Sequence, residues 1–327
     1  MRAFEHVEPH SLENAISFLT DDREEAVVMA GGTDLITEMR DRIAVPDRVV
    51  NLKSISGLDT LAFEPGKGLT IGPLVTLARL DKDPTVREKY GCLAEGASAA
   101  ASPQIRNQGT IGGNLCQRPR CPYYRDPELY CFKRGGGICY AEKGDNRYHS
   151  LFGGGPSHIV HPSDTAPPLV ALRAILQIVG PEGKRGVAIG DFFTLPEVDP
   201  MRENILEPNE VVAEIRLDDP PAGLRSAYIK ATQRGSWDFA LVSAACVLDF
   251  EGGVCSNARI VLGGVAPIPW RVEKAEGALV GKRIDEKSAA EAAELAFEGA
   301  KPMSGNRYKI PLGKAIVKRT ILRCAPQ

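Results

Sequence analysis

Short apolar stretches alternate with glycine turns and polar helices in the first part of the chain. Ser11 precedes four apolar residues at helical spacing between positions 12 and 19, which predicts an amphipathic helix with Ser11 as its N-terminal cap. A continuous apolar run then predicts a buried strand, and the glycine pair after it predicts a tight turn into a second helix. The pattern therefore predicts a small βαβ unit, with strands at 26–30 and 48–52, a Gly31-Gly32 turn and a helix at 33–40.

The apolar pattern continues as a second unit and, beyond a proline-rich boundary, as a C-terminal unit. A strand at 69–73 and helices at 77–80 and 86–101 lead toward a polar, glycine-rich segment. The run from Asp218 to Gly223 contains two prolines and two acidic residues and is the best domain boundary in the chain. Strands are further expected at 174–179, 211–217, 226–231, 241–250 and 258–262, and helices at 288–300 and 312–322, which makes the fold class α+β.

The segment from Ser102 to Asp164 breaks this pattern, because it has almost no hydrophobic periodicity. It opens with a polar loop, Pro103 to Leu115, that contains three glycines, and it continues with half of the chain's eight cysteines within 24 residues. Such a stretch cannot form a core of its own, so we expect it to be ordered by a bound group or to cover a binding site. The clustered cysteines are Cys116, Cys121, Cys131 and Cys139.

Composition and charge restrict the class of protein. The 327 residues suffice for two or three domains, and the formal net charge of -2 gives no general attraction to nucleic acid or anionic lipid. The N-terminus lacks the apolar run of a secretory signal, and no apolar stretch is long enough to span a bilayer. The cytoplasm is therefore the expected compartment, with export on a partner to the periplasm as the alternative. In a reducing compartment, clustered cysteines are more often metal or cluster ligands than disulfides.

Two glycine-rich turns are candidates for anion binding. The Gly31-Gly32 turn lies between a strand and a helix, where backbone N–H groups favour a phosphate, although a plain strand-to-helix turn has the same pattern. The second turn is Gly109 to Asn114, and a dinucleotide pyrophosphate held between two subdomains would need both turns. Neither has the Gly-x-Gly-x-x-Gly spacing of a nicotinamide-binding Rossmann domain, which argues against that fold.

Five motifs occur in an order that resembles the flavoproteins of the molybdenum hydroxylases. They are Ala30 to Leu35, Arg106 to Asn114, Asp164, Lys230 with Arg234 and Asp238 to Ala240, and Pro269 to Arg271. Together they cover essentially the whole chain, which resembles the separate FAD-binding subunit of the xanthine dehydrogenase and aldehyde oxidoreductase family. The resemblance implies a two-subdomain FAD-binding fold similar to that of the vanillyl-alcohol oxidase flavoproteins. The domains expected from it are FAD-binding subdomains at 1–55 and 56–219, with a cysteine-rich insertion at about 116–160, and a C-terminal α+β domain at 222–327.

The same resemblance implies the contacts with FAD. The pyrophosphate would lie on the backbone of the two glycine turns, the Asp164 carboxylate would hydrogen-bond along the FAD, and Lys230 would reach it from the C-terminal domain. Without the resemblance, Asp164 could be a turn or cap residue and Lys230 a surface lysine. Arg234, Asp238 and Arg271 could equally form ion pairs between domains. No catalytic acid or base is expected in this chain. The expected cofactor-binding set is Ala30, Gly31, Gly32, Thr33, Asp34, Leu35, Arg106, Asn107, Gly109, Thr110, Gly112, Gly113, Asn114, Asp164, Lys230 and Asp238.

The cysteine spacing resembles a subgroup whose flavin subunit carries an extra 4Fe-4S cluster, which includes the periplasmic aldehyde oxidoreductases and the 4-hydroxybenzoyl-CoA reductases. Such a cluster takes four ligands, usually thiolates, and Cys121, Cys131 and Cys139 match three of them. The position of the fourth cysteine in those relatives is Ser157 here. A three-cysteine cluster, a lost cluster, a zinc ion or a plain thiol-bearing loop are the other interpretations. The candidates for a fourth ligand are Ser157, His158, His149 and Cys116.

Three functions follow as hypotheses. In the first, the chain is the electron-transfer subunit of a heterotrimer, in which a large partner with a molybdenum cofactor oxidises the substrate, an aldehyde by resemblance. Electrons would pass through the 2Fe-2S clusters of a small partner to the FAD and on to an external acceptor. In the second, the chain is a self-contained flavin oxidase, but no acid–base constellation supports it. In the third, it is an assembly scaffold without flavin, and the intact glycine turns weigh against that.

Overall fold

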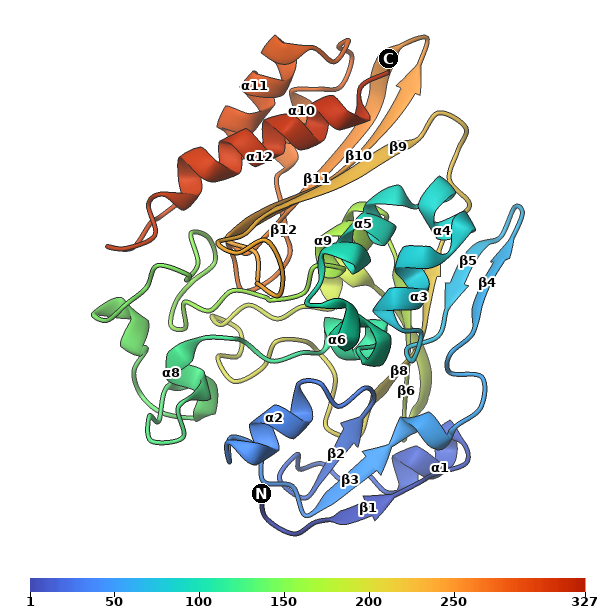
Figure 1. The fold of residues 1–327 in the computed structure, drawn as a ribbon, viewed down its shortest axis with the longest axis vertical. Helices are drawn as coiled ribbons and strands as arrows, with labels where there is room; N and C mark the ends of the chain where they lie inside the picture. Colours follow the sequence, from blue (N-terminus) through green and yellow to red (C-terminus); the bar gives the residue numbers. More distant parts are fainter. Residues whose placement is uncertain (327) are drawn as a thin grey trace.

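The computed structural model describes residues 1–326 and shows three β-sheets with helices packed against them (Figure 1). Each sheet takes its strands from one stretch of the chain, namely residues 5–51, 61–217 and 225–271. The predicted α+β class is confirmed. Each sheet lies within one of the three predicted domains, whose boundaries stay a prediction.

The N-terminal unit is the predicted βαβ arrangement with one further strand. Its sheet is parallel and has the order β1-β3-β2. The predicted cap is present, because the Ser11 side chain accepts a hydrogen bond from the Asn14 backbone N–H. Ala15, Leu19 and Val50 are buried in the core between helix and sheet. The elements are β1 (Glu5–Val7), α1 (Leu12–Ser17), β2 (Ala26–Met29), α2 (Leu35–Arg40), β3 (Arg48–Asn51) and the 3-10 helix η1 (Leu52–Ser54).

The middle unit contains a five-stranded antiparallel sheet with the order β4-β5-β8-β6-β7. Leu69 of β5, Leu80 of α3, Leu93 of α5 and Leu176 of β6 are buried in one core, so these helices cover one face of the sheet. The elements are β4 (Leu61–Glu64), β5 (Gly68–Ile71), α3 (Leu77–Lys82), α4 (Pro84–Lys89), α5 (Gly91–Ala99), α9 (Ala166–Ala171), β6 (Ile175–Gly180), β7 (Gly183–Ala188), the 3-10 helix η4 (Ile189–Asp191) and β8 (Val211–Leu217).

Residues 103–115, expected to form a loop, instead form two short helices, α6 (Pro103–Gln108) and α7 (Ile111–Leu115). Each helix begins at a capping side chain. The Ser102 hydroxyl accepts from the N–H three residues on, and the Thr110 hydroxyl accepts from the Gly113 N–H. Pro103 also suits the first position of a helix. The prediction of a loop was wrong, because the high glycine content of this segment outweighed the capping signals at Ser102 and Thr110.

The C-terminal sheet is antiparallel, has the order β12-β11-β10-β9 and is buried on both faces. Along β10, Ala244 and Cys246 belong to the core shared with the C-terminal helices, whereas Ala245 and Val247 pack with residues of α5 and α9. Figure 1 shows α10 to α12 on the outer face and α5 and α9 on the inner one. The elements are β9 (Arg225–Ala231), β10 (Val242–Glu251), β11 (Val254–Gly263), β12 (Trp270–Arg271), α10 (Glu273–Gly277), α11 (Glu286–Leu295) and α12 (Lys309–Cys324).

The cysteine-rich insertion is largely irregular, as its lack of periodicity predicts. It contains α8 (Pro122–Arg125) and the 3-10 helices η2 (Phe132–Arg134) and η3 (Tyr140–Glu142). In Figure 1 it lies to one side of the molecule, between α2 and the beginning of α12. None of the helices within residues 1–326 is long and apolar enough to cross a membrane.

Candidate functional site

The two glycine-rich segments lie against each other. The first is the turn between β2 and α2, and the second runs from Gly109, after α6, into α7. A Cβ atom on Gly31 would lie 2.2 Å from the carbonyl oxygen of Gln108, so only glycine permits this approach. The Gln108 side-chain amide donates to the Gly31 carbonyl oxygen at 3.3 Å. A Cβ atom on Gly112 would lie 2.8 Å from the Cβ of Pro73. The two segments predicted to hold one pyrophosphate therefore lie in contact.

The Asn114 side chain ties the second turn to residues 161–165. Its Oδ1 accepts hydrogen bonds from the Ser163 hydroxyl at 2.6 Å and from the Thr165 hydroxyl at 2.7 Å. Both serine and threonine hydroxyls are buried. Asn114 therefore fixes the position of the segment that contains Asp164 relative to the glycine turn.

Asp164 and Lys230, both expected to contact FAD, form a buried ion pair with each other. Lys230 Nζ lies 2.7 Å from Asp164 Oδ2, and each side chain is 5% exposed. The other carboxylate oxygen accepts from the Tyr228 hydroxyl at 2.6 Å, and Lys230 also donates to the Ala99 carbonyl oxygen at 2.9 Å. Burial raises the pKa of Asp164, and the Lys230 charge and the hydrogen bonds oppose this rise. The pair joins the middle unit to β9.

A large cavity of about 690 Å³ is lined in part by Ser163, and five parts of the chain contribute to its wall. One wall is the loop between β9 and β10, where Asp238 accepts hydrogen bonds from the backbone N–H groups of Gln233 and Arg234 at 2.9 and 3.0 Å. Asp238 therefore shapes the loop. The lining residues are Arg120, Cys121, Pro122, Tyr148, His149, Ile159, Val160, His161, Pro162, Ser163, Gln233, Arg234, Asp238, Phe239, Ala240, Leu241 and Gly264.

Two histidines of the large cavity each have a buried ring nitrogen without a partner among residues 1–326. His161 Nδ1 accepts from the Ser163 backbone N–H at 3.3 Å, which makes Nε2 the protonated nitrogen, and this Nε2 is unpaired. Burial lowers the pKa of His161 to about 4, so the ring is neutral at pH 7. Burial also lowers the pKa of His149 to about 4, and its Nδ1 is unpaired. A polar ligand in the large cavity could supply these missing partners.

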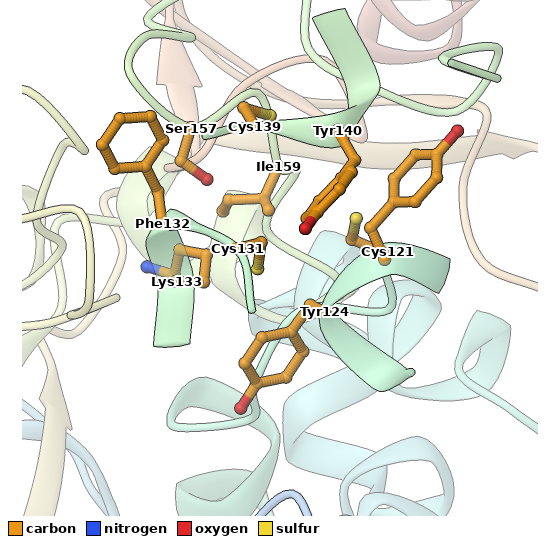
Figure 2. Close-up of a pocket in the computed structure, with 10 residues that line it drawn as sticks. Cys121, Tyr124, Cys131, Phe132, Lys133, Cys139, Tyr140, Ser157 and Ile159 are labelled. Carbon is orange, nitrogen blue, oxygen red and sulfur yellow. The ribbon is translucent and has the colours of Figure 1, made fainter. Parts of the chain in front are cut away.

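Cys121, Cys131 and Cys139 line a second cavity of about 10 Å³, which we call the thiol cavity. Figure 2 shows the three cysteines around Ile159, with Ser157 beside Cys139. Cys121 and Ile159 line both cavities, so the two are neighbours. Burial raises the pKa of Cys121 to about 11. The lining residues are Cys121, Tyr123, Tyr124, Cys131, Phe132, Lys133, Cys139, Tyr140, Ser157 and Ile159.

The structure separates the candidates for a fourth ligand. Ser157 lines the thiol cavity with the cysteines. His149 lines the large cavity, and its Nε2 lies 3.3 Å from Cys121 Sγ. His158 faces an acidic side chain at 3.7 Å, and Cys116 packs against the core of the middle unit, where burial raises its pKa to about 12. Within residues 1–326, no three His, Cys, Asp or Glu side chains are placed to hold one metal ion.

Charged side chains, most of them partly buried, anchor the insertion to the first glycine turn. The Asp34 carboxylate accepts from the Arg118 backbone N–H at 2.8 Å and pairs with Arg120 and Arg125 at 2.8 and 2.9 Å. Further along α2, Glu38 accepts from the Tyr124 hydroxyl at 2.7 Å, and burial raises the pKa of Glu38. The Asp34 side chain thus faces the insertion, so a phosphate contact at this position would use the backbone.

The C-terminal domain holds the other end of the insertion. Lys309, fully buried at the first residue of α12, donates to the carbonyl oxygens of Tyr148, His149 and Gly264 at 2.8, 3.0 and 2.8 Å. The Asn306 side chain also donates to the His149 carbonyl oxygen, at 3.0 Å. Burial lowers the pKa of Lys309 to about 7. These bonds fix the backbone of residues that line the large cavity.

The other expected FAD residues lie around the two turns. Arg106 donates to the carbonyl oxygen at the end of α5 at 2.8 Å, and Asn107 is exposed on α6. The Thr33 hydroxyl oxygen lies 3.8 Å from the position of a Cβ on Gly109. Their contacts with FAD stay a prediction.

Comparison with known proteins identifies the family. Residues 2–220 match the family described as the FAD binding domain in molybdopterin dehydrogenase, and residues 227–324 match the CO dehydrogenase flavoprotein C-terminal domain. The chain belongs to the FAD-binding subunits of the molybdenum hydroxylases. This FAD-binding subunit is therefore part of a molybdenum-containing oxidoreductase.

Curated relatives and solved structures agree with this assignment. The chain is 35% identical to the aldehyde oxidoreductase FAD-binding subunit PaoB of Escherichia coli (strain K12), over 92% of each chain. It is 30% identical to the carbon monoxide dehydrogenase medium chain of Afipia carboxidovorans, over 98% of this chain and 96% of that relative. The structure of quinoline 2-oxidoreductase from Pseudomonas putida 86 has a TM-score of 0.77 at 30% identity and covers 99% of this FAD-binding subunit and 97% of its own chain.

The side chains that hold these segments in place were not predicted from the sequence. Tyr228 stands two residues before Lys230 on β9, and strand alternation puts both on one face, so this spacing was a usable signal. The three arginines between positions 118 and 125 similarly indicated an acidic partner elsewhere in the chain. Asn306 and Lys309 gave no such signal, because their acceptors are backbone carbonyls.

Proposed function

We propose that this FAD-binding subunit works in a three-subunit complex and passes electrons from the 2Fe-2S clusters of a small partner to an external acceptor. A large partner with a molybdenum cofactor would oxidise the substrate, and the name of the relative PaoB favours an aldehyde. The relatives are named a subunit and a medium chain, which supports a complex of several chains. The observation that carries the proposal is the link between the glycine turns and the large cavity, which runs from Asn114 to Ser163.

The FAD pyrophosphate would bind the backbone of the two glycine turns, and the flavin ring would occupy the large cavity. The residues present fit such a ligand. Gly31 allows the two turns to meet, and the His161 Nε2–H is a buried donor without a protein partner among residues 1–326. The Arg120 guanidinium lies over the Phe239 ring, 5.2 Å from its centroid, at the cavity wall. FAD, when bound, supplies the redox chemistry, and the protein supplies its position and electrostatic surroundings.

The buried pair of Asp164 and Lys230 has a positioning role in this proposal. It fixes the end of β9, and the loop that follows β9 lines the large cavity. Lys230 itself does not line the large cavity, and its charge is paired with Asp164, so its effect on a bound flavin would be through position.

We also propose that the thiol cavity holds a 4Fe-4S cluster. Three cysteines from different parts of the insertion face one enclosed space, and the cluster type takes mainly thiolate ligands. The thiols, including the Cys121 thiol with its raised pKa, would release their protons on binding iron. A cluster here would lie next to the large cavity, because Cys121 lines both.

The test is purification of the tagged chain under anaerobic conditions together with the proteins that accompany it. We expect flavin absorbance, two further chains, molybdenum, and bleaching of the flavin band on addition of an aldehyde. The tagged chain alone should keep FAD but show no bleaching. Bleaching of the isolated chain would instead establish a self-contained oxidase, and a colourless protein would establish a scaffold without flavin.

A further inference from the structure

The wall of the thiol cavity contains one oxygen donor besides the three cysteines. Ser157 is 2% exposed and lines the cavity together with Cys121, Cys131 and Cys139. Figure 2 shows its hydroxyl on the side of Ile159, toward the space that the cysteines surround. Within residues 1–326 this hydroxyl makes no hydrogen bond to the protein. This hydroxyl is therefore available to a group held in the cavity.

The chemistry of the donor set agrees with an iron ligand at Ser157. The cluster needs a fourth donor, and the only other side chains of the cavity with polar ends are three tyrosines and Lys133. Lys133 is paired with Glu203 at 2.7 Å, and the Tyr124 hydroxyl is bonded to Glu38. A serine oxygen binds iron after its proton passes to solvent, just as the thiol protons do. The iron–oxygen bond then replaces the O–H bond with no change in oxidation state.

The competing donors are placed less favourably. His149 touches Cys121 but lines the large cavity and not the thiol cavity. His158 faces Glu142, and Cys116 packs against the core of the middle unit. None of these three side chains lines the thiol cavity.

We propose that the Ser157 oxygen completes the ligand set of the cluster, in the place where the related proteins are expected to have a cysteine. This inference rests on the proposed 4Fe-4S cluster. A serine oxygen is a harder donor than a thiolate and favours the more oxidised irons. The cluster therefore has a lower reduction potential than its counterpart with four cysteines, and it releases one iron more readily.

The experiment uses the full chain, reconstituted anaerobically with ferrous iron and sulfide, as wild type, Ser157→Ala and Ser157→Cys. We expect about four irons per chain in the wild type. Ser157→Ala should lose about one iron of the four and show the electron paramagnetic resonance signal of a three-iron cluster after mild oxidation. Ser157→Cys should keep all irons and shift the reduction potential upward. Ser150→Ala is the matched control, because Ser150 is a buried serine that lines neither cavity.

FAD content, measured on each variant, shows whether the protein has folded. If Ser157→Ala has the wild-type FAD content, the wild-type iron content and an unchanged reduction potential, Ser157 is not a ligand, although the cluster is present. A wild-type chain that keeps FAD but takes up no iron overturns the cluster and the Ser157 assignment together. The FAD part of the proposed function survives both outcomes.

Discussion

Replacement of Lys230 by methionine leaves Asp164 as a buried carboxylate whose remaining side-chain donor is the Tyr228 hydroxyl. Removing one partner of a buried ion pair costs about 3–5 kcal/mol. At about 2–4 °C per kcal/mol for a domain of 150–250 residues, the thermal midpoint should fall by roughly 6–20 °C at pH 8. The double variant that also carries Asp164→Asn should recover part of this loss, because no charge then stays buried without a partner.

The loss should depend on pH, which a simple packing defect would not. Burial already raises the pKa of Asp164, and removal of the Lys230 charge, which opposes this rise, should raise it further. When a carboxyl has a higher pKa in the folded than in the unfolded state, stability is lost as the pH rises from the unfolded value of about 3.9 toward the folded one. The deficit of Lys230→Met should therefore shrink as the pH falls from 8 toward 4.5.

Thermal unfolding followed by tryptophan fluorescence at both pH values tests this reasoning. Lys53→Met serves as the control, because Lys53 is exposed and forms no ion pair among residues 1–326. We expect the control to match the wild type at both pH values. An equal deficit of Lys230→Met at pH 8 and pH 4.5 would refute the argument from buried charge.

Three further predictions concern the segments around the two cavities. Gly31→Ala should lose most of its FAD, since the new Cβ would lie 2.2 Å from a backbone oxygen, whereas Gly190→Ala, with nothing within 4 Å of its Cβ, should keep its FAD. Flavin absorbance after purification measures both, and a full FAD content in Gly31→Ala would contradict the close approach. Tyr124→Phe leaves Glu38 without its hydroxyl donor. It should destabilise the protein by about 1–3 kcal/mol and speed proteolysis of the insertion. Tyr130→Phe, at a side chain that is 62% exposed, should change neither stability nor proteolysis. Burial lowers the pKa of Lys309 to about 7, so between pH 7 and pH 9.5 the unfolded state binds more protons than the folded state. Wild-type stability should therefore rise over this pH range, and Lys309→Met should lack the rise. Urea midpoints with the same pH slope in both proteins would contradict the prediction.

Local pattern was sufficient for elements whose partners lie nearby in the sequence. The Ser11 cap and the βαβ unit were predicted correctly, because a side-chain cap and a parallel strand pair leave signals within a few tens of residues. The antiparallel middle sheet was not predicted, because β5 pairs with β8, which lies far along the chain. The helices α6 and α7 were missed, because composition concealed their caps at Ser102 and Thr110.

In the candidate site, too, features that depend on local sequence were predicted and features that depend on distant contacts were not. Glycine patterns and cysteine spacing pointed to the two turns and to the thiol cavity, since both depend on residue type at short spacing. The pairing of Asp164 with Lys230 could not be predicted, because it depends on how deeply two units bury each other's charges. The hydrogen bonds from Lys309 to the insertion could not be predicted either, since their acceptors are backbone carbonyls that any sequence provides.

The double attachment of the insertion has a consequence for the order in which the protein matures. Its bonds reach back 84 residues to Asp34 and forward 161 residues to Lys309. A growing chain therefore cannot complete the walls of either cavity until synthesis has passed the start of α12 and the C-terminal domain has folded. Until then the clustered cysteines stay accessible to oxidants and to stray metal ions. Cofactor insertion must consequently follow translation, and a chain that stops before residue 309 leaves its thiols unprotected.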